Sequence, residues 1–340
     1  MPITAVAAFS LREPKSGRAY TLIQIKDSSG LSGWGEASRI EADSLNLARQ
    51  ILRGQEHTRY DVLTHQLASD PISGAINMAL LDLCGKAAKA PVFQVLGGPT
   101  RNKVRALTSY HEAALDQGHR AFVVPVAMPR EITSRPRFVA SVVERFEALR
   151  KRHGEGIDFV ADGMGLMPSA EANDVAVALE PLHPLWFDQP CRAPNSDILA
   201  RMTTESATPI GLGRDFDQAG PLQNLLRDGL IDVVRLSIGR LGVTPIRRAA
   251  ALAETYYVAV APFHLSGGPI ATAAAIQLAA SLPNFFIQQM PLVLEAEDRK
   301  MRDEITGGPI EAVKEGYFSL SLKPGLGIDV NESVVRRMAI

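Results

Sequence analysis

The chain has 340 residues, of which 46% are hydrophobic and 21% are charged, and this composition is typical of globular domains. Lys and Arg total 36 and Asp and Glu total 37, so the formal net charge of −1, together with the lack of a Lys/Arg-rich stretch, argues against the basic surface of a nucleic-acid-binding protein. The apolar runs are too short to cross a bilayer, and two cysteines are too few for a disulfide framework. We therefore expect a cytoplasmic protein with no nucleic acid and no membrane partner.

Residues 1–103 are predicted to form an α+β capping domain. An alternating run over residues 20–25, a turn at 27–30 and a second alternating run over 31–36 predict an antiparallel hairpin. Helical periodicity follows over residues 42–52 and 73–90. Strands followed by a run of helices are typical of an α+β layer rather than of a βαβ unit.

From about residue 104 the pattern changes to short β-rich runs that alternate with helical segments. The runs cover residues 104–110, 121–126, 157–162, 185–188, 210–213, 232–236, 258–262 and 285–289. Helical segments follow most of them, at residues 134–152, 169–179, 217–227, 244–255 and 268–282. Seven to eight such β/α steps predict a TIM-type (β/α) barrel over residues 104–322, with the tail, 323–340, returning to the cap. A doubly wound open sheet is the alternative, although no G-x-G-x-x-G motif follows the first strand.

The carboxyl ends of the predicted strands carry the candidate functional residues, because the βα loops of a barrel converge there. These ends present Tyr110 with His111, Asp162, Asp188, Arg214 with Asp215, Ser237, His264 and Gln289. We expect the two carboxylates on neighbouring strands, the guanidinium and the imidazole to face one small anionic ligand.

Asp162 and Asp188 form the pair with the clearest chemistry. Hard divalent cations such as Mg²⁺ bind carboxylate oxygens, and the third and fourth strand ends are neighbours that could share one ion. The alternative is a salt bridge from Asp188 to Arg214, which requires no metal.

His264 stands at the end of the seventh predicted strand, just before a Gly-rich turn and a helix. A neutral imidazole suits general acid–base catalysis, and a helix N-terminus suits an anion. A histidine with a purely structural hydrogen bond is the alternative.

Four segments of the chain carry a family resemblance. They are Gly33-Trp34-Gly35-Glu36, the run 75–83 with Lys86 and residues 94–98, Trp186-Phe187-Asp188-Gln189-Pro190, and Ala261-Pro262-Phe263-His264 with Gly268-Pro269-Ile270. Together they resemble the mandelate racemase/muconate lactonizing enzyme branch of the enolase superfamily. The fourth segment is similar to acid-sugar dehydratases of that branch.

The resemblance implies a lyase or isomerase that removes the proton α to the carboxylate of an acid sugar while Mg²⁺ stabilises the enediolate. It implies metal ligands at the ends of strands three to five. Asp162 matches the first ligand, Asp188 stands where Glu is usual, and Arg214 occupies the place of the third Glu. Asp215 beside it could serve as the third ligand only if the loop rotated. His264 aligns with the seventh-strand general acid or base. Relatives form dimers to octamers, so a homo-oligomer is expected.

The sequence also departs from the family pattern. Residues 122–125 lack the usual K-x-K pair, no aspartate near residues 236–237 orients His264, and Gln289 replaces an acid. Arg214 changes the formal charge of the ligand set from −3 to −1, and two like charges a few ångströms apart repel by about 4 kcal/mol at an effective dielectric near 20, so we expect a degraded Mg²⁺ site. Two further hypotheses are a non-catalytic carboxylate-binding protein and a metal-independent enzyme that uses Arg214, His264 and Tyr110 or His111.

Overall fold

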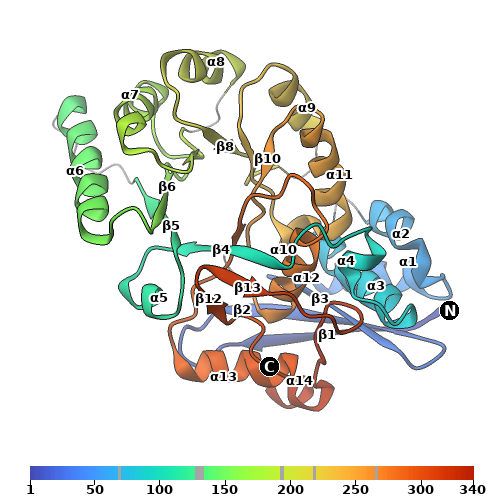
Figure 1. Cartoon of the computed structure of the whole chain (residues 1–340). Helices are drawn as coiled ribbons and strands as arrows, with labels where there is room; N and C mark the ends of the chain where they lie inside the picture. Colours follow the sequence, from blue (N-terminus) through green and yellow to red (C-terminus); the bar gives the residue numbers. More distant parts are fainter. Residues whose placement is uncertain (68–69, 127–133, 192–194, 217–219, 265–266) are drawn as a thin grey trace.

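The computed structural model describes residues 1–67, 70–126, 134–191, 195–216, 220–264 and 267–340. An N-terminal antiparallel sheet with its helices lies beside a parallel β/α barrel (Figure 1). The predicted fold class, a barrel with an α+β cap, is confirmed. The boundaries at residues 103 and 322 stay a prediction.

The cap is built on a three-stranded sheet in the order β1-β2-β3. Its strands are β1 (Ile3–Arg12), β2 (Ala19–Asp27) and β3 (Ser32–Ala37). Strands β2 and β3 form the predicted antiparallel hairpin, in which Ile23 pairs with Gly35. The sequence did not reveal β1, because alanines interrupt its alternation and alanine is depleted in strands. The cap helices are α1 (Ala42–Leu52), α2 (Tyr60–Gln66), α3 (Ser73–Ala87) and α4 (Val92–Val95), with a 3₁₀ turn at His57–Arg59.

Helix α3 is the central helix of the cap, and it approaches β3 closely. A β-carbon added at Gly33 would lie 2.0 Å from the carbonyl oxygen of Ala79, and one at Gly35 would lie 1.9 Å from that of Ala75. Only glycine leaves room for this contact between a strand and a helix backbone. The glycines of the Gly33-Trp34-Gly35-Glu36 motif therefore set the distance between sheet and helix.

Polar side chains of α3 connect the cap to the barrel and to the tail. The Asn77 amide oxygen accepts hydrogen bonds from the first backbone N–H groups of α11 (Val243–Glu254), at 2.8 and 3.0 Å. The Asp82 carboxylate accepts the backbone N–H groups of Trp34 at 3.0 Å and Leu326 at 2.8 Å. Burial of these groups is tolerated because each is hydrogen-bonded.

Eight parallel strands form the barrel. They are β4 (Lys103–Ser109), β5 (Ala121–Pro125), β6 (Asp158–Asp162), β7 (Phe187–Asp188), β8 (Ile210–Leu212), β9 (Val233–Val234), β10 (Ala259–Val260) and β11 (Gln288–Gln289). Each pairs with the next from β4 to β10, and β11 pairs with β4. Bridges from Val260 to Phe285 and from Phe263 to Gln289 close the ring. The doubly wound open sheet is therefore excluded.

Helices surround the barrel, and those over residues 112–116, 196–205 and 238–241 were not predicted from the sequence. They are α5 (Glu112–Asp116), α6 (Arg135–His153), α7 (Ser169–Leu179) with a 3₁₀ turn at Glu180–Leu182, α8 (Ser196–Glu205), α9 (Gly220–Arg227), α10 (Ile238–Leu241), α11 and α12 (Pro269–Ala279). No helix in the described part of the chain has the length and apolar character that crossing a bilayer requires.

The C-terminal region comprises α13 (Ala296–Thr306), the hairpin β12 (Val313–Lys314) and β13 (Tyr317–Ser319), and α14 (Glu332–Met338). Strand β13 pairs with β4, and α14 lies against β1 of the cap (Figure 1). The backbone N–H of Ile340 donates to the carbonyl of Ser10 at 3.0 Å. These contacts place the end of the chain against β1 of the cap.

The Gly35→Ala variant tests the close packing of α3 on β3. We expect it to lower the free energy of unfolding by about 3 kcal/mol, because the new methyl group overlaps the helix backbone. Urea titration followed by circular dichroism measures the change. Gly156→Ala is the matched control, since a β-carbon there meets no atom within 4 Å. Equal stability of the two variants would contradict this account of the cap.

Candidate active site

Side-chain alternation determines which residues face the barrel mouth. One apolar cluster fills the interior below the mouth: Leu107, Ala121, Val123, Val160, Trp186, Val233, Ala261 and Ile287. Residues two positions after a strand's inward residue face inward again. Those next positions are Ser109, Pro125, Asp162, Asp188, Arg235, Phe263 and Gln289. The mouth therefore carries two acids and one arginine on strands, with apolar residues at β5 and β10.

Arg214 joins this layer from the loop after β8. Its Nη1 lies 3.0 Å from Asp162 Oδ2, and its Nη2 donates to Asp188 Oδ2. The backbone of Arg214 is held by Gln189, whose amide oxygen accepts the Arg214 N–H at 2.8 Å in the orientation that satisfies both groups. Asp162, Asp188 and Arg214 are thus brought together, and the salt-bridge alternative for Asp188 is the one that the structure contains.

Arg235, at the end of β9, is the site residue that the sequence analysis missed. It is fully buried, and its Nε lies 3.2 Å from each Asp188 oxygen. Its Nη1 donates to the Ala261 carbonyl and its Nη2 to the Gln289 side-chain oxygen. An arginine between two apolar residues, two positions after the inward-facing Val233, was the available signal.

The four charged groups of the cluster sum to zero, since two carboxylates face two guanidiniums. Burial raises the pKa of Asp162; Arg214 opposes this rise and Asp188 adds to it. Burial alone would lower the pKa of Arg214, but the two carboxylates outweigh it and hold the value above its ordinary range. Burial lowers the pKa of Arg235, and Asp188 opposes that shift. The arginines therefore neutralise acids that would otherwise be costly to bury.

These residues do not fit a divalent cation. Asp162 and Asp188 already bind guanidiniums, and Asp215, the third expected ligand, is exposed. Within the described ranges no group of three or more His, Cys, Asp or Glu side chains could hold a metal ion. A Mg²⁺ site needs carboxylate oxygens free to coordinate, and here both acids are already paired with arginine.

His264 lies outside the charged cluster. Phe263, its neighbour, faces the mouth and places its ring 5.6 Å from the Arg214 guanidinium and 5.5 Å from that of Arg235. The His264 side chain points to the cap instead, where Nε2 lies 3.2 Å from Glu36 Oε1. The implied role of His264 as general acid or base therefore has no support from its position, and the structural alternative accounts for its contacts.

Glu36 ties the cap to the first turn of α12. Its carboxylate, fully buried, accepts backbone N–H groups of Gly268, of Ile270 at 3.0 Å and of Ala271 at 3.2 Å. These are N–H groups that a helix start leaves without partners, and the helix dipole favours a negative charge there. The anion expected at this turn is thus supplied by the protein itself.

Tyr110 also lies outside the cluster. Its hydroxyl donates to Glu112 at 2.6 Å and lies 3.0 Å from His153 Nε2 on α6. Its ring packs edge-on against Phe122. The alternation of β4 turns Ser109 toward the mouth and Tyr110 toward the surrounding helices, so the expected catalytic position of Tyr110 is not observed. His111 caps α5, where it accepts the Ala113 N–H.

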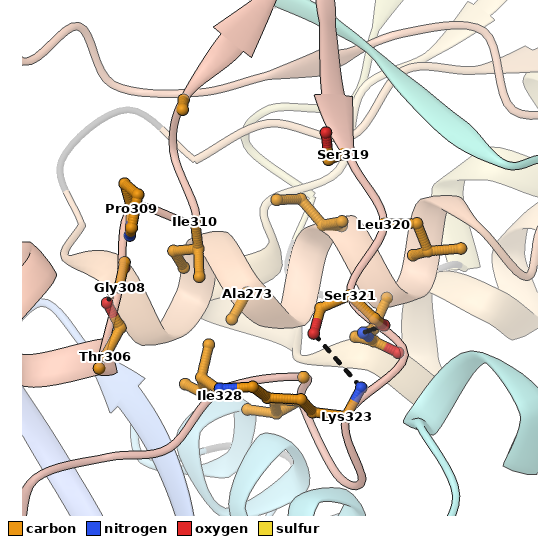
Figure 2. Close-up of a pocket in the computed structure, with 16 residues that line it drawn as sticks. Ala273, Thr306, Gly308, Pro309, Ile310, Ser319, Leu320, Ser321, Lys323 and Ile328 are labelled. Carbon is orange, nitrogen blue, oxygen red and sulfur yellow. Dashed lines mark hydrogen bonds between the residues drawn. The ribbon is translucent and has the colours of Figure 1, made fainter.

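A cavity of about 360 Å³ lies away from the barrel mouth, between α12, the end of α13 and the chain around residues 319–328 (Figure 2). Its polar groups already bind one another. Ser321 accepts the backbone N–H of Lys323 at 3.4 Å, and the Lys323 ammonium pairs with Asp329. The barrel mouth, where charged groups converge, is the better candidate for chemistry.

Comparison with known proteins gives a family match over most of the chain. Residues 106–334 match the family described as "Enolase C-terminal domain-like". D-galactonate dehydratase of Pectobacterium atrosepticum is 26% identical over 364 residues, which cover 98% of this chain and 94% of that protein. D-galactonate dehydratase of Ralstonia pickettii is 26% identical over 345 residues, covering 93% and 90%.

Solved structures show the same fold. An enolase from Agrobacterium radiobacter with bound Na and L-malate has a TM-score of 0.87 and 25% identity, covering all of this chain and 95% of that one. An enolase from Pantoea ananatis with bound D-gluconate and Mg has a TM-score of 0.83 and 23% identity, covering 100% and 95%.

The Glu36→Gln variant tests the contact between cap and barrel. We expect it to lower the free energy of unfolding by about 2 kcal/mol, because an amide group cannot accept all the N–H donors that surround the carboxylate. Thermal unfolding followed by circular dichroism measures the loss. The control is Glu297→Gln, at an exposed ion pair with Lys15. An unchanged midpoint for Glu36→Gln would show that the capping contact does not stabilise the fold.

Proposed function

The chain belongs to the mandelate racemase/muconate lactonizing enzyme branch of the enolase superfamily, and from this membership we propose that it is a lyase or isomerase acting on an acid sugar. The relatives named above act on D-galactonate by name, and the A. radiobacter structure holds L-malate. Both are small hydroxycarboxylates. We propose that a ligand of this class binds at the barrel mouth.

The observation that carries the proposal is the position of Arg214. Its side chain is 13% exposed, and its Nε has no hydrogen-bond partner within the described residues. Once released from the two acids, the guanidinium could bind a carboxylate through two parallel hydrogen bonds, one of them from Nε. We propose that Arg214 turns from Asp162 and Asp188 to the ligand carboxylate when the ligand enters.

The proposed chemistry needs no divalent cation. The related P. ananatis structure contains Mg, but in this chain Arg214 replaces the third acidic ligand and the remaining acids are paired. The guanidinium of Arg214 would supply the positive charge for the negative charge that develops on the ligand carboxylate. The degraded Mg²⁺ site stays a prediction, and we propose that a cation of the protein takes the place of the metal ion.

Asp162 is the group that we propose moves the proton. Its oxygen takes the proton from the ligand carbon next to the carboxylate, and the electron pair moves toward that carboxylate. The protonated acid then gives the same proton to the departing β-hydroxyl group, which leaves as water and yields an enol. The raised pKa of Asp162, caused by burial, makes it a stronger base than an exposed aspartate.

A second candidate is a binding protein without catalysis. Pro125 and Phe263 occupy the mouth positions of β5 and β10, so neither flank of the charged cluster offers a titratable side chain. Enolase-type chemistry on two faces of a substrate would require such groups. Homo-oligomerisation and a cytoplasmic location also stay predictions.

The Arg214→Met variant tests the ligand position. We expect D-galactonate or a related acid sugar to bind about 100-fold more weakly, a loss of roughly 3 kcal/mol, because the charged pair with the carboxylate is removed. Isothermal titration calorimetry measures the affinity. Arg201→Met on α8, whose exposed arginine pairs with Glu205 at 2.8 Å, serves as the matched control. Equal affinity of both variants and the wild type would rule out the proposed site.

Turnover of an acid-sugar library in EDTA tests the chemistry. We expect the wild-type rate to be unchanged by EDTA, and Asp162→Asn to lower kcat on the order of 10³-fold while the affinity for ligand remains. Release of the enol product, detected by its conversion to a ketone, measures the rate. Asp228→Asn, at an exposed pair with Arg227, is the control. Loss of activity in EDTA that Mg²⁺ restores would contradict the metal-independent reaction, and binding without turnover would favour the second candidate.

A further inference from the structure

Arg235 and Arg214 bind the same carboxylate but differ in their freedom to move. Arg235 has no exposed surface, and its three nitrogens are bonded to Asp188, the Ala261 carbonyl and Gln289. Its guanidinium also lies 5.1 Å from the ring of Trp186. The partners lie on three strands, β7, β10 and β11, or directly next to them, so Arg235 is fixed in place.

Arg214 is held by fewer and more accessible contacts. It follows Gly213, whose backbone has φ of +125°, and beyond the two acids its guanidinium meets the face of Phe263. If Arg214 were the sole partner of Asp188, its departure would leave a buried carboxylate without a counter-charge. Arg235 removes this obstacle, because it remains bonded to both oxygens of Asp188.

We infer that Arg235 is a positioning residue that serves as the permanent counter-cation of Asp188, closes the strand ends to divalent cations and lets Arg214 leave Asp188 and Asp162 for a ligand carboxylate. Only the last of these three statements, the release of Arg214 to a ligand carboxylate, rests on the proposed function. Arg235 supplies the positive charge that a bound metal ion would supply, and it stays bonded to Asp188 whether or not a ligand is present. To reach Asp188, a metal ion would have to displace the guanidinium of Arg214 and also separate the buried guanidinium of Arg235 from its partners.

Gain of cation binding tests this inference, with Mn²⁺ as the probe and the loss of the free-ion signal in electron paramagnetic resonance as the readout. Wild type and Arg214→Glu are both expected to leave millimolar Mn²⁺ free, because Asp188 is still neutralised. The double variant Arg214→Glu/Arg235→Gln is expected to bind Mn²⁺ at least about tenfold more tightly than Arg214→Glu, since three carboxylates then face no guanidinium.

Two control variants distinguish the effect of charge on Mn²⁺ binding from an effect of misfolding. Arg214→Gln/Arg235→Gln removes both positive charges without adding a carboxylate and is expected to bind Mn²⁺ more weakly than the double variant with glutamate. Arg214→Glu/Arg235→Lys keeps a charge near Asp188 and is expected to resemble Arg214→Glu. Circular dichroism verifies that each protein is folded.

Tight Mn²⁺ binding by Arg214→Glu alone, or by the wild type, would overturn the inference. That outcome is decisive even if the double variant fails to fold, because both of these proteins retain Arg235. Neither measurement contains an acid sugar, so failure of the proposed function and failure of this inference give different results.

Discussion

The carboxylate of Asp188 is completely buried and is bonded by two arginine side chains, and this interaction determines what the barrel mouth can do. A buried acid must find a counter-charge, which in a metal-dependent site is the ion. Here Arg235 reaches it from β9 and Arg214 from the loop after β8. The cluster with Asp162 is neutral, so it attracts neither a divalent cation nor, while closed, an anion. A ligand carboxylate enters only by taking Arg214 away from its acids.

The features that place the chain in its family are mostly architectural. Gly33 and Gly35 bring α3 against the cap sheet, Glu36 caps α12, and Asn77 caps α11. These contacts assemble the cap and the barrel irrespective of what the strand ends carry. Fold and chemistry are therefore separable in this protein, and membership of the family supports the ligand class more strongly than it supports the usual mechanism.

The sequence was sufficient for the barrel because each strand is a short apolar run next to a periodic helix, and helix α7 falls at the predicted residues. It missed β1, whose alanines weaken the alternation. At the site, Asp162, Asp188 and Arg214 converge as expected because consecutive strands end side by side. His264 and Tyr110 do not, because each is one residue out of phase with the inward-facing positions. The motif aligns His264 with the end of the seventh strand but does not determine which way its side chain points, and Phe263 takes the inward position. Arg235 was overlooked because an arginine inside an apolar strand becomes meaningful only when its distance from Asp188 is known.

The most direct test of the account is a crystal structure of the protein grown with millimolar MnCl₂ and an acid sugar, with anomalous scattering recorded for manganese. The account predicts no anomalous peak between Asp162 and Asp188, with Arg235 still bonded to Asp188 and the Arg214 guanidinium on the ligand carboxylate. A peak about 2 Å from oxygens of both aspartates, with the two arginines displaced, would contradict it.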